Sequence, residues 1–233
     1  MRRRESSLAA VGLLTAALGA SMAAPVARAD EARPCKPEAW ADAVAAFVKQ
    51  DEREAPPAAG VLFVGSSSVR MWDLKKSFPD LPAINRGFGG SQVCDSVHYL
   101  DELVVKHRPR TVVLYAGDND LAAGKSAERV HRDVVEFVTR LRAALPETKI
   151  VYVSIKPSVA RWKLAAKIRA ANGLIERTAQ EEKQFVFVDV WGEMLGDDGL
   201  PRKELLRDDG LHLTDAGYEV WTKLVRPHLE ESK

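Results

Sequence analysis

Two short motifs, far apart in the chain, hold the residue types that nucleophilic catalysis by a serine requires. The GSSS segment at residues 65–68 offers a hydroxyl, and the DGLH segment at residues 209–212 offers an imidazole and a carboxylate. Such catalysis needs a hydroxyl, a base that takes its proton, and an acceptor that fixes the tautomer of the base. The two motifs therefore predict acyl-transfer chemistry, provided that folding brings them together.

His212 is the candidate base because a carboxylate lies close to it in the sequence. Asp209 stands three residues earlier, and the glycine between them lets the chain curl back so that the carboxylate can accept from the ring. Asp208 competes for this role, although the spacing favours Asp209. The other four histidines fall on predicted helices or near the end of the sequence and are expected to be structural.

Short apolar runs that alternate with amphipathic stretches indicate the elements that must position these groups. The runs are rich in β-branched and aromatic residues, which is typical of buried parallel strands. They predict strands at 61–65, 83–87, 111–117, 150–155 and 185–190. Helices are expected near 37–50, 91–107, 126–145, 161–182 and 214–226. This alternation predicts an α/β fold, a three-layer α/β/α sandwich around a mostly parallel five-stranded sheet.

Polar residues follow four of the five predicted strands. Ser67 follows the first strand, Gly90 lies after the second, Asn119 comes after the third, and Asp209 and His212 lie beyond the fifth. The loops that leave the carboxyl ends of parallel strands meet in one crevice. We therefore expect these five residues to share one site.

Acyl transfer also needs donors that stabilise a tetrahedral oxyanion. The backbone N–H of Gly90 can approach a substrate closely because no side chain blocks it. The side-chain amide of Asn119 and the backbone N–H of Ser67 are the other candidates. Structural roles remain open for two of these residues, because Gly90 could only form a turn and Asn119 could only cap a helix.

Four segments carry a resemblance to a known family. GSSSVRMW, NRGFGGSQ, YAGDNDLAAG and DDGLHLTDAGY resemble, in order and spacing, the four blocks of the SGNH or GDSL-type serine esterase and acylhydrolase family, over about residues 61–225. The resemblance implies a flavodoxin-like sandwich and a Ser67, Asp209 and His212 triad. It also implies an oxyanion hole formed by Ser67, Gly90 and Asn119. A small-molecule ester would be the substrate, and no cofactor or metal would be needed. We expect a short-chain acyl or acetyl ester, such as a lysolipid or an acetylated glycan, cleaved through an acyl-serine intermediate.

The chain departs from the usual pattern of this family at two positions, Ser66 and Ser68. The GDSL motif reads GSSS here, so that Ser66 replaces the aspartate before the nucleophile. The Gly-x-Ser-x-Gly elbow of α/β-hydrolases is missing, because Val69 occupies the place of its second glycine. A further segment after the fourth strand contains Lys156, Arg161 and Trp162; it could line the pocket or simply form a proline turn, and their role stays open.

The first 29 residues have the layout of a secretory signal peptide. Arginines at residues 2–4 precede an apolar run at about 8–24, and an Ala-Arg-Ala end predicts cleavage before Asp30. We therefore expect an exported protein, periplasmic or extracellular, with no stable membrane anchor. The sequence leaves open whether export follows the general or the twin-arginine route.

Cleavage would leave 204 of the 233 residues, enough for one compact domain. We expect an N-terminal helix and linker at 30–60 and a hydrolase domain at 61–233. The leader holds four arginines and one glutamate, so its removal changes the net charge from +1 to −2. This balance argues against a nucleic-acid partner. Cys35 and Cys94 could form a disulfide or be two buried thiols, and the oligomeric state is open.

Two other classes of function compete with a serine esterase. A set of carboxylates and one imidazole could hold a divalent metal in a phosphoesterase, although no second histidine stands at ligand spacing. This set comprises Asp118, Asp120, Asp208, Asp209 and His212. The chain could also be an exported glycan- or lipid-binding module with vestigial catalytic residues.

Overall fold

The computed structural model describes residues 35–57 and 59–229, so the predicted leader lies outside the described residues. Five strands form one sheet: β1 (Val61–Gly65), β2 (Ala83–Gly87), β3 (Thr111–Tyr115), β4 (Lys149–Val153) and β5 (Val186–Val188). Every pairing is parallel and the order is β2-β1-β3-β4-β5. This order is the flavodoxin-like one, and the predicted fold class is confirmed.

Helices cover both faces of the sheet. The α-helices are α1 (Ala41–Arg53), α2 (Ser67–Arg70), α3 (Leu74–Ser77), α4 (Val93–His98), α5 (Leu100–Leu103), α6 (Asp118–Ala122), α7 (Ala127–Ala144), α8 (Ala165–Glu182) and α9 (Asp215–Val225). The 3₁₀-helices are η2 (Pro37–Trp40), η3 (Val105–His107), η4 (Trp162–Leu164), η5 (Gly192–Met194), η6 (Lys203–Leu205) and η7 (Arg226–His228). None of the helices in these ranges is long and apolar enough to cross a bilayer.

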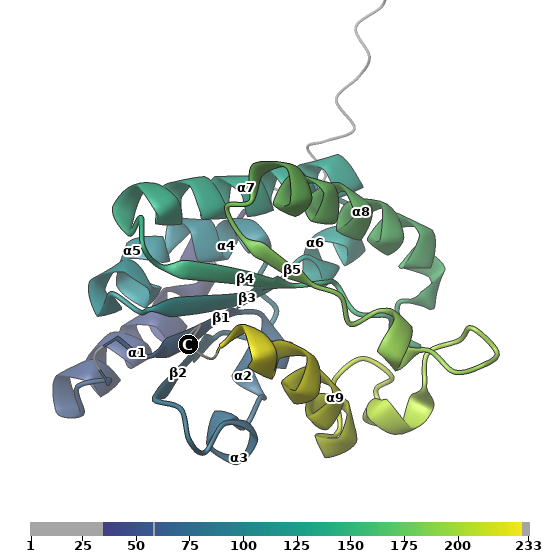
Figure 1. Cartoon of the computed structure of the whole chain (residues 1–233), viewed down its shortest axis with the longest axis horizontal. Coiled ribbons are helices and arrows are strands. Elements are labelled where there is room, and N and C mark those ends of the chain that lie inside the picture. Colours follow the sequence, from purple (N-terminus) through teal and green to yellow (C-terminus); the bar gives the residue numbers. More distant parts are fainter. Residues whose placement is uncertain (1–34, 58, 230–233) are drawn as a thin grey trace, which may run out of the picture.

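Two hydrophobic cores separate the three layers. Alternate residues of the central strands point to opposite faces, as Leu62 and Phe63 of β1 do. On one face they pack against α1, α4, α7 and α8, and on the other against α2, α3 and α9. Figure 1 shows α7 and α8 on one side of the sheet and α9 on the opposite side.

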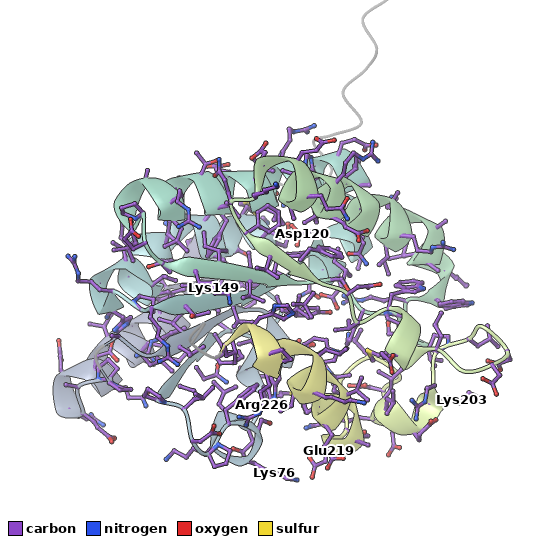
Figure 2. All side chains as sticks on the ribbon, viewed as in Figure 1. Lys76, Asp120, Lys149, Lys203, Glu219 and Arg226 are labelled. Carbon is purple, nitrogen blue, oxygen red and sulfur yellow. A yellow bond between two sulfur atoms is a disulfide. The ribbon has the colours of Figure 1, made fainter. Side chains whose placement is uncertain are left out.

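Charged side chains divide between the surface and the interior. Figure 2 shows Lys76 and Glu219 pointing outward from the layer that contains α9, and both are exposed. Asp120 lies inside the molecule beneath α7 and is fully buried. A buried carboxylate requires a partner, and this one has an ammonium group, described below.

The pattern of the sequence predicted strands and long helices better than short helices. The bounds of β1 and β2 match the prediction, and α7 differs by one residue at each end. The single helix expected near 91–107 is wrong, because the chain divides there into α4, α5 and η3. The four- and five-residue helices α2, α3 and α6 were not predicted, since so few residues show no helical periodicity.

Candidate active site

Ser67 lies at the first position of α2, directly after the end of β1. Gly65 turns the chain with a φ of +134°, where a side chain would overlap the carbonyl oxygen of Tyr115. The N–H of Ser66 donates to that same oxygen over 3.0 Å. The serine was expected in a loop, but it begins a short helix. Its N–H therefore belongs to the first turn, where backbone donors have no partner within the helix.

Folding brings the two catalytic motifs into direct contact. His212 Nε2 lies 2.9 Å from Ser67 Oγ, and His212 Nδ1 lies 2.5 Å from Asp209 Oδ2. The two contacts form a continuous chain from hydroxyl to carboxylate. The structure thus brings Asp209, rather than Asp208, to the ring of His212.

Hydrogen bonds hold Asp209 in its ionised form. The side chain of His212 contributes most, followed by the backbone N–H groups of His212 and Leu211, and together they lower the pKa of the carboxyl below its ordinary value of 3.8. Asp209 Oδ1 accepts from Leu211 N over 2.8 Å and from His212 N over 2.9 Å. An ionised carboxylate fixes the ring, because it accepts a hydrogen bond from Nδ1–H and leaves Nε2 to accept from a hydroxyl.

Backbone contacts fix the loop that carries the histidine. The N–H of Arg207 donates to the carbonyl of His212 over 2.7 Å, and the N–H of Gly210 donates to the carbonyl of Arg207 over 2.8 Å. The N–H of Ala160 donates to the carbonyl of Gly210 over 3.0 Å. The loop after β4 therefore braces the loop of the histidine.

The two other predicted anion donors lie on the same side of the sheet. Gly90 has a φ of +80°, which favours glycine, and the six-membered ring of Trp40 stands 3.1 Å from the position of a Cβ there. Asn119 Nδ2 donates to the carbonyl of Ser91 over 2.9 Å, and Asn119 Oδ1 accepts from Arg161 Nη2 over 2.8 Å. The amide is thus held at both of its ends.

A cavity of about 1200 Å³ lies at the candidate site. Its lining includes Ser67, Gly90, Asn119 and His212, and one wall consists of the segment from Trp40 to Pro57. The sequence predicted that segment only as a helix and linker. Nothing in its local pattern identified it as a wall of the site.

Several contacts fasten this wall to the domain. Cys35 and Cys94 form a disulfide, with 6.1 Å between their Cα atoms, which answers the question that the sequence left open. Trp40 Nε1 donates to Asp95 Oδ2 over 3.0 Å. Tyr99 Oη donates to the carbonyl of Pro37 over 2.8 Å. Trp40 is therefore anchored beside Gly90.

Three of the four carboxylates of the candidate metal set have separate partners. Asp118 lies 2.9 Å from Arg161 Nη1 and 3.6 Å from Lys156 Nζ. Asp120 accepts from Lys125 Nζ over 2.9 Å, and Asp209 contacts His212. These three carboxylates thus have three different side-chain partners.

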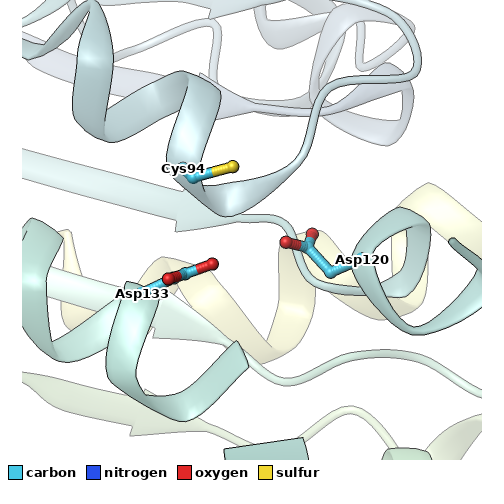
Figure 3. Close-up of side chains that lie close together, drawn as sticks. All are labelled: Cys94, Asp120 and Asp133. Atoms are coloured by element: carbon cyan, nitrogen blue, oxygen red, sulfur yellow. The ribbon is translucent and has the colours of Figure 1, made fainter. Parts of the chain in front are cut away.

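A different acidic cluster has the spacing of a metal site. Figure 3 shows Cys94, Asp120 and Asp133 facing one another. The Nζ of Lys125 lies 2.9 Å from both carboxylates and 3.2 Å from the sulfur of Cys94. An ammonium group therefore stands among these ligand atoms, and the sulfur is already part of the disulfide.

Comparison with known proteins agrees with this geometry. Residues 64–220 match the GDSL-like Lipase/Acylhydrolase family. No curated protein sequence matches the chain significantly.

Similar solved structures share the fold. A candidate platelet activating factor from Streptococcus pneumonia is 23% identical, with a TM-score of 0.73 over 81% of this chain and 92% of its own. A GDSL-like lipase from Bacteroides thetaiotaomicron is 22% identical, with a TM-score of 0.69 over 80% and 96%. A candidate acylhydrolase from Bacteroides fragilis is 23% identical, with a TM-score of 0.66 over 86% and 97%.

The family match begins just before the serine and ends just after the histidine. It spans about two thirds of the sequence and includes all five predicted site residues. Since a match of this extent shows membership, the chain belongs to the GDSL-like lipase and acylhydrolase family and is an ester hydrolase of that family.

Proposed function

We propose that the protein is an exported serine hydrolase that cleaves carboxylic esters through an acyl-serine intermediate on Ser67. The observation that carries the proposal is the continuous contact from Ser67 Oγ through His212 to Asp209, with distances of 2.9 and 2.5 Å. A hydroxyl in contact with a neutral imidazole can lose its proton as it attacks a carbonyl.

The reaction then has two halves. His212 takes the proton of Ser67 as Oγ bonds to the acyl carbon, and it returns that proton to the departing alkoxide. In the second half His212 takes a proton from water as the water oxygen attacks the acyl carbon. His212 then gives that proton to Ser67 Oγ as the bond between Oγ and the acyl carbon breaks, which releases the acid and the free serine. The carboxylate of Asp209 stabilises the imidazolium that forms in each half.

Three hydrogen-bond donors are available to stabilise the negative charge on the tetrahedral intermediate. The backbone N–H groups of Ser67 and Gly90 and the amide of Asn119 border the same cavity as Ser67 Oγ. Fixed donors at such a position lower the barrier because they need no reorganisation when charge develops.

The size of the cavity favours an ester in which either the acyl group or the alcohol is large. A volume of about 1200 Å³ exceeds what an acetyl group and a small alcohol would fill. Trp40, Phe47 and Phe88 contribute apolar wall, while Arg70 adds a charged group at the cavity. We therefore propose an ester of a bulky amphipathic molecule, such as a lysolipid or an acetylated glycan, rather than a small soluble ester.

Export is supported by the arginine-rich and apolar leader and by the Cys35–Cys94 disulfide, since disulfides persist in oxidising compartments. Amino-terminal sequencing of the protein recovered from the periplasm or medium should begin at Asp30. Recovery of the uncleaved chain from the cytosol would contradict this part of the proposal.

Hydrolysis of a short-chain p-nitrophenyl ester tests the reaction. Ser67→Ala should lower kcat by roughly a thousandfold or more, because the nucleophile is lost. Ser66→Ala and Ser68→Ala are the matched controls and should retain far more activity. A chelator should leave the rate unchanged, whereas loss of activity with chelator would favour the metal-dependent alternative. Wild-type activity from Ser67→Ala would overturn the nucleophile assignment.

A further inference from the structure

One segment near the site has no role in the proposed mechanism: the loop after β4, which leads into η4. It contains Arg161, whose guanidinium lies at the cavity and is about four fifths buried. Its Nη2 donates to Asn119 Oδ1 over 2.8 Å, and its Nη1 lies 2.9 Å from Asp118 Oδ2. One side chain thus contacts two consecutive residues of α6.

The chemistry of a guanidinium dictates which end of the Asn119 amide faces it. Arginine only donates hydrogen bonds, so the oxygen of the amide must face Arg161 and the nitrogen must face away. The nitrogen then donates to the carbonyl of Ser91, the residue after Gly90. One amide N–H is used on Ser91, so that the second N–H, and not the oxygen, is left for an oxyanion in the cavity that Asn119 lines.

The arginine is itself held in place. Asp118 is buried and pairs with it, and the neighbouring Trp162 stacks on Trp191 with 6.0 Å between ring centroids. The N–H of Ala160 donates to the loop that carries His212. The guanidinium is therefore held in place relative to α6, which carries Asn119, and to the loop that carries His212.

We propose that Arg161 is a positioning residue that locks the side-chain amide of Asn119 in the orientation that donates to the oxyanion. This proposal rests on the proposed function. A flipped amide would present a carbonyl oxygen to the developing negative charge, so that a donor would become a repulsive group. Arg161 acts through Asn119 and need not touch the substrate.

Kinetics of single and double variants test the proposal. Arg161→Met should lower kcat about ten- to a hundredfold with KM changed only a few-fold, because the missing interaction acts in the transition state. In an Asn119→Ala background the same change should lower kcat less than twofold, since the group that it positions is gone. Arg161→Lys should restore part of the rate, because one ammonium cannot reproduce the two-pronged contact.

Arg70 provides the matched control. It also lines the cavity, but no contact joins it to Asn119 among the residues that the structure describes. The effect of Arg70→Met should therefore be the same in the presence and in the absence of Asn119. Equal losses from Arg161→Met in the two backgrounds, or a loss confined to KM, would overturn the positioning role.

A readout without turnover separates this proposal from the proposed function. The side-chain NH₂ of Asn119, identified by its loss in Asn119→Ala, should give two well-dispersed signals in a ¹⁵N–¹H spectrum of the wild type. Arg161→Met should move or broaden both signals while the backbone spectrum stays folded. Unchanged signals would refute the positioning role even if the esterase is active, whereas changed signals in an inactive enzyme would refute only the esterase.

Discussion

Asp118 and Asp120 stand two residues apart on α6, and both are buried, but their surroundings differ. Asp120 accepts from Lys125 Nζ and from the N–H of Val93. Lys125 also donates to Asp133, whose other oxygen accepts from Arg129 over 2.8 Å. Two carboxylates and two cations thus form a closed cluster, which we call the Lys125 cluster.

The cluster around Asp118 is open. Its Oδ2 lies beside Arg161 and Lys156, while its Oδ1 has no hydrogen-bond partner among the residues that the structure describes. Burial lowers the pKa of Lys156, and Arg161 is the cation that lies closer to the carboxylate, at 2.9 Å against 3.6 Å. The guanidinium extends past Asp118 to the amide of Asn119 at the cavity.

The comparison shows that similar buried ion pairs can serve different ends. In the Lys125 cluster, Lys125 donates to both buried carboxylates, so we expect the cluster to contribute to stability alone. Beside Asp118, Arg161 also donates out of the ion pair to Asn119, the proposed donor to the oxyanion. We therefore expect this cluster to affect the reaction rate. Four variants should separate these two effects.

Lys125→Met should have the largest effect, on stability. It leaves Asp120 and Asp133 buried with one cation fewer, and breaking a buried pair costs about 3–5 kcal/mol of the free energy of unfolding. Urea unfolding measures the loss. Lys156→Met is the matched control and should cost less, because Asp118 keeps Arg161. Equal losses for the two variants would remove the distinction between closed and open clusters.

Asn119→Ala should lower kcat strongly and change the free energy of unfolding only slightly. Loss of one oxyanion donor costs about 3–4 kcal/mol of transition-state stabilisation, or roughly a hundred- to a thousandfold in kcat. The change in unfolding free energy should stay within about 1 kcal/mol, since the side chain is partly exposed. Ester hydrolysis and urea unfolding of the same preparation give both values. A kcat within threefold of wild type would exclude Asn119 from the oxyanion hole.

The paired substitution Cys35→Ser and Cys94→Ser should lower stability by about 2–4 kcal/mol, because the disulfide joins positions 59 residues apart. The folded variant should keep most of its kcat, since the hydrogen bonds of Trp40 to Asp95 and of Tyr99 to the carbonyl of Pro37 still hold the wall of the cavity. Dithiothreitol should shift the unfolding curve of the wild type toward that of the variant. An unfolding curve of the wild type that does not respond to the reductant would contradict the predicted contribution.

The smallest effect should be a pH dependence from Asp120. Burial raises the pKa of its carboxyl from 3.8 to about 6, because desolvation outweighs the attraction of Lys125. A raised pKa in the folded state favours the protonated form, so its stabilising effect is present below pH 3.8 and is lost as pH rises through about 6. Relative to Asp120→Asn, the wild type should lose about 1–3 kcal/mol between pH 4 and 7. A constant difference in unfolding free energy across this range would show that Asp120 does not titrate there.

The sequence predicted the frame of this protein and the proximity of its candidate catalytic groups. Period and composition are local properties, so β1 and β2 could be bounded to the residue. The parallel topology then required the loops after the strands to meet, and Ser67 and His212 do meet although 145 residues separate them.

Contacts that depend on lateral packing could not be predicted in the same way. Arg161 reaches Asn119 across 42 residues, and only the conformation of the loop after β4 decides which side chain it contacts. The same applies to Trp40, which precedes the family match and reaches Gly90 through the packing of its helix. The pairing of Cys35 with Cys94 also became visible only in three dimensions.

Covalent trapping of the nucleophile tests the central claim most directly. The wild-type protein should react with a fluorophosphonate, and peptide mapping by mass spectrometry should find one label per molecule, on Ser67. Ser67→Ala should remain unlabelled and His212→Ala should label far more slowly, since the hydroxyl then lacks its base. A label on another residue, or an unlabelled enzyme that still hydrolyses esters, would contradict the account.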